Sequence, residues 1–226
     1  LTDEKSLHVA FYVPRDASSG ERRFKIYVRG ERMTLSQVLP VLQSMGVEVV
    51  DERPYEIVFD DDSHFWIYDF GLHINPQVLE GAEGDPQLDS LRERFEETFR
   101  AVWLGAAEVD RFNALVLHAG LTWRQAAMLR AYAKYLRQVG TAYSQDYIED
   151  AILAHRTTTV SLVRLFETRF DPKLSDEERS SAEADLVADV TKLIDEVTSI
   201  DADRILRSYL NLIRAALRTN YFVAGP

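Results

Sequence analysis

Cysteine is absent from the 226-residue sequence, and this absence removes several kinds of chemistry at once. Without a thiol, the chain can form no disulfide, offer no thiolate nucleophile and build no cysteine-based metal site. The ten glycines never fall into the G-x-G-x-x-G or G-x-x-x-x-G-K-[ST] spacings of dinucleotide-binding and phosphate-binding loops. We therefore expect this chain to bind no nucleotide and no other cofactor.

Basic residues are also in short supply. The 26 Lys and Arg residues stand against 37 Asp and Glu, which gives a formal net charge of −11. This balance argues against nucleic acid or an anionic membrane as the main partner, because both attract basic surfaces. No apolar run approaches the roughly 20 residues that a membrane-spanning helix needs. We expect a cytoplasmic protein.

The start of the chain, LTDEKSLHVAFYV, has no initiating methionine and no basic leader followed by an apolar segment. This pattern predicts that there is no signal peptide and that the sequence is cut from a longer one. Hydrophobic residues make up 46% of the chain and charged residues 28%. Such a composition is typical of one large or two ordinary globular domains.

A two-residue period marks strands in the first third of the chain. Apolar side chains alternate from Leu7 to Val13 and again from Phe24 to Val28, as they do in half-buried strands. After Gly30 the period becomes helical, with Thr34 or Ser36 as the N-cap. The other elements expected here are strands from Val47 to Phe59 and from Phe65 to Ile74, a loop from Pro76 to Pro86, and an amphipathic helix from Leu88 to Val102.

The rest of the chain has helical patterns only. A short helix from Val109 is expected to stop at Gly120, and Thr122 with Gln125 predicts a capping box for a helix that begins at Trp123. Ser144 is expected to cap the next helix, and Asp171-Pro172 to close that region, because the residue before proline leaves helical geometry. A second capping box is predicted at Ser175 and Glu178, and a final helix from Ser199 or Asp201.

The order β-β-α-β-β-α, followed by helices alone, predicts an α+β fold. We expect an antiparallel sheet with two helices on one face, and an all-α segment behind it. We place the domains at residues 1–106 and 107–226.

Two motifs invite a catalytic interpretation and have plainer ones. Asp69-Phe70-Gly71 matches the magnesium-binding triplet of protein kinases, but the glycine-rich loop, catalytic HRD and strand lysine of that family are missing. We interpret the triplet as the end of a strand. The acidic run from Asp60 to Asp62 lacks the ligand spacing of an EF-hand and is typical of a solvated hairpin tip.

The five histidines show no HxH or HxxxH spacing, so a zinc site would have to be assembled by tertiary contacts alone. His118 lies where a helix ends, and His155 lies on an apolar helix face, as structural histidines often do. The final helix carries Arg204, Arg207, Arg214 and Arg218, which form either a docking surface for an acidic domain or a solvated face paired with neighbouring acids. We assign no catalytic, cofactor-binding or metal-binding residue.

Several long strings carry a resemblance to a known family. They are MTLSQVLPVLQSMGVEVVDERPYEI and WIYDFGLHI in the first third, and LVLHAGLTWRQAAMLRAYAKYLRQ, SQDYIEDAI and LVRLFETRFDP between Asp110 and Pro172. From about Arg23 to about Phe222 the chain resembles the region upstream of the catalytic domain in large bacterial NAD-specific glutamate dehydrogenases. The resemblance implies an ACT-like regulatory module followed by a helical segment. It carries over no catalytic residue, because it places the glutamate- and NAD-binding domains beyond Pro226.

The resemblance implies a non-catalytic regulatory and oligomerisation region. The parent enzyme would convert L-glutamate, NAD and water to 2-oxoglutarate, ammonium and NADH. Implied partners are the catalytic domain of the same polypeptide, other subunits of a homo-oligomer and an amino-acid effector. ACT domains often bind amino acids at a glycine between the first strand and the first helix, a place that Arg29 and Gly30 occupy here.

This sequence departs from the usual β-α-β-β-α-β order of ACT domains. One strand precedes the expected first strand and none clearly follows the second helix, so we expect a sheet that is permuted or extended. An alternative function is a stand-alone amino-acid-sensing or scaffold protein with no enzyme attached, which a stop codon after Pro226 would indicate.

Overall fold

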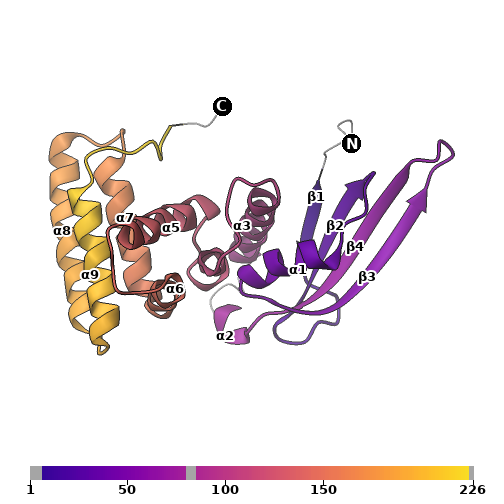
Figure 1. Ribbon diagram of the computed structural model, residues 1–226, viewed down its shortest axis with the longest axis horizontal. Coiled ribbons are helices and arrows are strands. Elements are labelled where there is room, and N and C mark those ends of the chain that lie inside the picture. Colours follow the sequence, from indigo (N-terminus) through magenta and orange to yellow (C-terminus); the bar gives the residue numbers. More distant parts are fainter. Residues whose placement is uncertain (1–6, 80–84, 224–226) are drawn as a thin grey trace. The chain divides into compact units, whose positions relative to one another are not determined.

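The computed structural model describes residues 7–79 and 85–223 (Figure 1). The chain divides into two compact units, Leu1–Trp123 and Arg124–Pro226. The first unit contains the sheet, and the second is entirely helical in its described part.

The first unit is built on one four-stranded sheet. Its strands are β1 (His8–Tyr12), β2 (Glu21–Arg29), β3 (Glu48–Val58) and β4 (His64–His73). They are ordered β1-β2-β4-β3, and every neighbouring pair is antiparallel. The predicted α+β class with an antiparallel sheet is therefore confirmed.

Helices cover one face of this sheet (Figure 1). α1 (Leu35–Ser44) and α3 (Asp85–Trp103) contact the strands. The shorter helices η1 (Arg111–Ala114) and α4 (Leu115–His118) pack against α1 and α3, and α2 (Pro76–Leu79) contacts α4. Thr34 forms the capping box of α1 with Gln37. The rings of Phe11 and Phe24 pack on Phe95 of α3, with centroids 4.7 and 5.3 Å apart. These aromatic residues have almost no exposed surface, so they form the centre of the core.

The strand order decides between a permuted and an extended sheet. In a β-α-β-β-α-β domain the last strand pairs beside the first at the sheet edge. Here β2 takes the place of that first strand, and β1 occupies the edge position beside it. Because no strand follows α3 in the described part of the chain, the N-terminal strand replaces the usual last one. The sheet is permuted.

The packing of the first unit continues beyond residue 106, where the sequence placed a domain boundary. η1 and α4 pack against α1 and α3, and Leu117 belongs to the core under the sheet. Asn113 is fully buried and donates a hydrogen bond to Ser44 in α1 at 3.1 Å. By packing, the units separate at Trp123 and Arg124.

The second unit follows the predicted helix starts and stops closely. Its helices are α5 (Trp123–Gln138), α6 (Gln145–Ala154), α7 (Arg156–Phe170), α8 (Asp176–Asp195) and α9 (Ile200–Ala215). Ser144, Ser175 and Ser199 each accept a hydrogen bond from a backbone amide in the first turn, as N-caps do. α7 ends at Phe170, directly before Asp171-Pro172, as expected.

Helix α9 provides the inner surface of the second unit. It packs against α6, α7 and α8. Its buried residues are Ala202, Ile205, Leu206, Tyr209, Leu210 and Ile213. The hydroxyl of Tyr209 donates to the carbonyl of Leu129 in α5 at 3.0 Å, which satisfies the one polar group that this ring buries.

The residues after α9 fold back onto the second unit. Arg169 donates to the carbonyl of Ala216 at 3.3 Å, and the hydroxyl of Tyr221 donates to Glu167 at 2.8 Å. Arg124 donates to the carbonyl of Tyr221 at 2.6 Å. None of the helices in residues 7–79 and 85–223 combines the length and apolar character that a bilayer crossing requires.

Candidate functional site

The sheet face opposite the helices holds the groups with the most evident chemistry. Strand register places its side chains in rows across β2, β4 and β3. From one end to the other, these rows are Arg23–Gly71–Asp51, Lys25–Asp69–Arg53, Tyr27–Ile67–Tyr55 and Arg29–Phe65–Ile57. We call this surface the open face. Its first two rows are charged, and the third and fourth are mainly apolar.

An arginine–carboxylate network occupies the charged rows. Arg23 donates to Asp69 Oδ1 through Nε and to Asp51 Oδ1 through Nη1, both at 2.9 Å, and to the carbonyl of Asp69 at 2.8 Å. Tyr12 donates to Asp69 Oδ2 at 3.1 Å. Burial alone would lower the pKa of Arg23, but the bonds to Asp69 and Asp51 raise it. Arg23 and Asp69 are each only 7% exposed, so the network ties β2 to β4 and β3.

The network explains the Asp69-Phe70-Gly71 triplet. Asp69 is the carboxylate that Arg23 binds, and Phe70 lies on the other face in the core. A Cβ atom at position 71 would lie 2.8 Å from Oδ2 of Asp51, so glycine leaves room for that carboxylate. The triplet lies within β4, as the interpretation as a strand end required.

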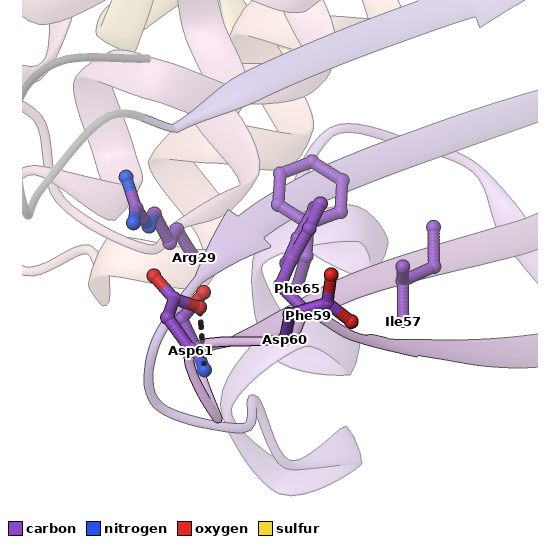
Figure 2. A pocket seen from close by; sticks show the side chains of 7 residues that line it. Arg29, Ile57, Phe59, Asp60, Asp61 and Phe65 are labelled. Atoms are coloured by element: carbon purple, nitrogen blue, oxygen red, sulfur yellow. Dashed lines mark hydrogen bonds between the residues drawn. The ribbon is translucent and has the colours of Figure 1, made fainter.

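A hollow of about 630 Å³ lies at the opposite end of the open face (Figure 2). Its floor is a cross-strand row, Arg29 on β2, Phe65 on β4 and Ile57 on β3. The hairpin between β3 and β4 completes it with Phe59, Asp60, Asp61 and Ser63. Figure 2 shows Arg29 and Asp61 at one end and Ile57 at the other, so the hollow has a charged end and an apolar end.

The charged side chains of the hollow differ in whether they form hydrogen bonds within the protein. Asp61 accepts a hydrogen bond from the amide of Ser63 at 3.0 Å, and bonds with Ser63 together with the charge of Arg29 lower its pKa. The side chains of Arg29 and Asp60 form no hydrogen bond or ion pair within the described part of the chain. An exposed guanidinium and carboxylate beside apolar side chains are available to a ligand that carries charge.

Gly30 lies beside this hollow without lining it. Its φ of 93° is in the left-handed region, and its amide donates to the carbonyl of His64 at 3.0 Å. The role visible for Gly30 is therefore to turn the chain out of β2. Of the two candidate ligand-binding residues named from the sequence, Arg29 lines the hollow and Gly30 does not.

The histidines lie at separate places. His64 approaches Glu56 at 2.6 Å, His73 lies beside Gly20, and His118 lies beside Gly46. His155 is half-buried at the junction of α6 and α7. Among residues 7–79 and 85–223, no group of three or more His, Asp and Glu residues is arranged to hold a metal ion.

Two arginines of the final helix are paired with acids. Arg207 donates to Asp203 at 2.9 Å and to Asp195 at 2.6 Å, and Arg204 lies 3.9 Å from Asp201. Bonds to Asp203 and then Asp195 raise the pKa of Arg207. This part of α9 is the solvated, acid-paired face that was one of the two interpretations.

The sequence interpretation missed the apolar lining of the hollow. Ile57, Phe59 and Phe65 were assigned to strands without a face. The alternation of residue types along β3 could have indicated that these side chains share one face of the sheet. On β3 the outward positions Tyr55 and Ile57 are apolar, while the inward position between them is Glu56.

Comparison with known proteins gives three family matches in order along the chain. Residues 6–86 match the glutamate dehydrogenase ACT3 domain, residues 107–172 match glutamate dehydrogenase helical motif 3, and residues 189–226 match the bacterial NAD-glutamate dehydrogenase catalytic domain. The chain is related to a segment of the NAD-specific glutamate dehydrogenases. The family resemblance expected from the sequence is confirmed.

The relatives carry the same name. An NAD-specific glutamate dehydrogenase of Mycobacterium tuberculosis is 46% identical over 99% of this chain, and one of Halomonas elongata is 42% identical over 88%. One of Pseudomonas aeruginosa is 38% identical over 98% of the chain. The chain spans only 12–14% of the length of these glutamate dehydrogenases.

The third match begins earlier than the sequence led us to expect. We placed the catalytic domain of the glutamate dehydrogenase beyond Pro226, yet its family model begins at residue 189, inside α8. The ACT3 match covers the whole sheet, including the N-terminal strand β1. The permuted sheet therefore lies within the region that the ACT3 family model describes.

Proposed function

We propose that this chain is a non-catalytic regulatory and assembly region of an NAD-dependent glutamate dehydrogenase. The parent enzyme converts L-glutamate, NAD and water to 2-oxoglutarate, ammonium and NADH in this proposal, with NAD bound outside the chain. The observation that carries the proposal is the order of the three matches: ACT3 domain, helical motif 3 and the start of a catalytic domain. The proposed partners are that catalytic domain and other subunits of a homo-oligomer.

The regulatory part of the proposal is an amino-acid effector in the hollow on the open face. Arg29 binds the carboxylate of the effector, because a guanidinium matches a carboxylate with two parallel donors. The acidic tip at Asp60 and Asp61 faces the ammonium group. The rings of Phe59 and Phe65 hold an apolar side chain. The ends of the hollow thus match the polar and apolar ends of a hydrophobic amino acid.

Calorimetric titration of the 226-residue chain tests the effector. Leucine and phenylalanine are expected to release or absorb heat on binding, and glycine is expected to bind more weakly because it lacks the apolar group. Arg29→Gln should weaken binding at least roughly tenfold, since a charge-assisted bond contributes about 1.5–3 kcal/mol. Arg15→Gln, which removes an exposed arginine outside the hollow, is the matched control. Absence of heat for every amino acid would overturn the effector proposal.

An enzyme assay tests the parent activity separately. The 226-residue chain alone should produce no NADH from L-glutamate and NAD, and the longer polypeptide that continues beyond Pro226 should produce it. In that longer protein, an effective amino acid should change the rate, and Arg29→Gln should remove the change while the basal rate stays. NADH formation by the chain alone would contradict the proposal, and a stop codon after Pro226 would favour a stand-alone sensor or scaffold.

A further inference from the structure

The distal half of the β3–β4 hairpin carries apolar side chains on the face that points away from its own core, as well as on the helix side. An antiparallel sheet with helices on one face normally places apolar residues towards the helices and polar residues outward. On β3 the outward residues Tyr55 and Ile57 are apolar, whereas the helix-side residue between them, Glu56, is charged. The outward face of β3 therefore has the apolar residues of a buried face, although no helix in the described part of the first unit covers it.

Neighbouring strands extend the same pattern. The outward residues of the third and fourth rows are Tyr27 on β2, Phe65 and Ile67 on β4, and Tyr55 and Ile57 on β3, which we call the apolar belt. Tyr55 is 51% exposed and Ile57 43%, and Phe59 at the end of the belt is 50% exposed. Contiguous exposed apolar residues framed by charge are typical of an interaction surface.

The free edge of β3 is a poorer docking element than the face. Pro54 lies in the middle of this edge strand. Proline has no amide hydrogen to offer a further strand, and it is a common means of preventing strand addition at a sheet edge. A partner is therefore expected to cover the apolar belt with side chains and not to lengthen the sheet.

We propose that the apolar belt pairs face to face with the same belt of a second copy of this chain, about a two-fold axis that lies in the interface, parallel to the cross-strand rows. The charges at the two ends of the belt support this occupant. On one side lies the Lys25–Asp69–Arg53 row, in which Arg53 has an exposed side chain and only a 3.7 Å approach to Asp51. On the other side lies the acidic tip, where Asp60 has no ion pair within the described residues.

A two-fold axis through the belt brings these ends together twice. Each copy places its Arg53 row opposite the acidic tip of the other, while the apolar rows meet between them. The surface is thus self-complementary in charge and in apolar character. The pairing rests on the assembly role proposed above and specifies its surface. Because the belt and the hollow share Ile57 and Phe65, the dimer and a bound effector exclude each other.

Sedimentation equilibrium of the 226-residue chain tests the pairing. We expect a concentration-dependent dimer that Ile57→Asp weakens by at least roughly 30-fold, the effect typical of a central interface residue. Leu217→Asp is the matched control, because Leu217 is an 88% exposed aliphatic residue of the second unit and should leave the dimer unchanged. Far-UV circular dichroism of each variant verifies that the fold is intact.

Charge reversal tests the two-fold register. Arg53→Glu and Asp60→Lys should each weaken the dimer, and the two substitutions together should restore it. A chain that stays monomeric, as it would if another part of the polypeptide covered the belt, overturns the proposal. So does a dimer that survives Ile57→Asp, or one that the double reversal fails to restore. These measurements involve no enzyme activity or amino acid, so their failure is distinguishable from failure of the proposed function.

Discussion

At the scale of single residues, the network around Arg23 shows why an apparently open sheet face can be rigid. Removing one member of a buried ion pair leaves the other charged and unsolvated, which costs about 3–5 kcal/mol. Arg23→Met should therefore reduce the stability of the first unit by about this amount, because Asp69 is 7% exposed and loses its main partner. Hydrogen exchange of the β2 and β4 amides measures the fall in the free energy of unfolding, because amides that exchange through global unfolding exchange faster when the unit is less stable.

A nearby arginine provides the control for that experiment. Arg53 carries the same charge two residues from Asp51, but its side chain is 63% exposed. Exposed ion pairs typically contribute about 0–1 kcal/mol, so Arg53→Met should change exchange little. If Arg53→Met and Arg23→Met had equal effects, burial would not be the source of the strength of the network.

At the scale of elements, the stability of the N-terminus of helix α8 depends on pH. Ser175 and Glu178 form a capping box in which Glu178 accepts hydrogen bonds from the hydroxyl and amide of Ser175, and these bonds lower the pKa of Glu178. A carboxylate whose pKa is lower in the folded state stabilises that state above its ordinary pKa. The contribution is lost as the pH falls through the lowered folded value.

Carbon-13 NMR titration of the Glu178 carboxyl measures this effect. The folded chain should titrate below the ordinary glutamate range, and Ser175→Ala should bring the midpoint back up. Exchange of the first amides of α8 should rise over the same pH interval in the wild-type chain. An unchanged midpoint in Ser175→Ala would show that the capping box does not lower the pKa.

The elements also show which parts of the fold a sequence reveals. The N-caps Ser144 and Ser175 were predicted, and Thr34 and Ser199 were each one of two predicted candidates, because capping is local, with donor and acceptor within three residues. The break between α6 and α7 is less evident. The residue pattern gives no definite boundary between Ser144 and Asp171, whereas α6 ends and α7 begins at His155, where ψ is 58°. There Thr159 bonds back to the carbonyl of Ile152 at 2.8 Å, a tertiary contact that propensity does not report.

The candidate site was less predictable than the fold, because strand register decides it. Arg23 and Asp69 are 46 residues apart in sequence, and no local pattern indicates that they face each other across β2 and β4. The resemblance led to Arg29, but it gave no sign of Phe65 or of the hairpin that encloses the hollow. Residues that meet across a sheet can be identified only after the order β1-β2-β4-β3 is known.

At the scale of the whole molecule, family boundaries and packing boundaries fall at different residues. Residues 189–226 match a catalytic-domain model, yet α9 within them packs against α6 and α7. The helical motif and the start of the catalytic domain therefore share one hydrophobic core. A structural change in α9 has a direct path to α6 and α7, through side chains that the two family regions bury together.

A chain cut at residue 188 tests this shared core. The cut removes Ile205, Leu206, Leu210 and Ile213, and burial of four such side chains contributes on the order of 10 kcal/mol. That is comparable with the whole stability of a typical domain, about 5–15 kcal/mol. The 1–188 chain should therefore lose the helices of its second unit, seen as lower helical ellipticity and fast exchange in α5 to α7. The 1–123 chain, cut where packing separates the units, should keep a folded sheet. Protected α5 to α7 amides in the 1–188 chain would mean that the helical motif folds without α9 and that the family boundary is also the structural one.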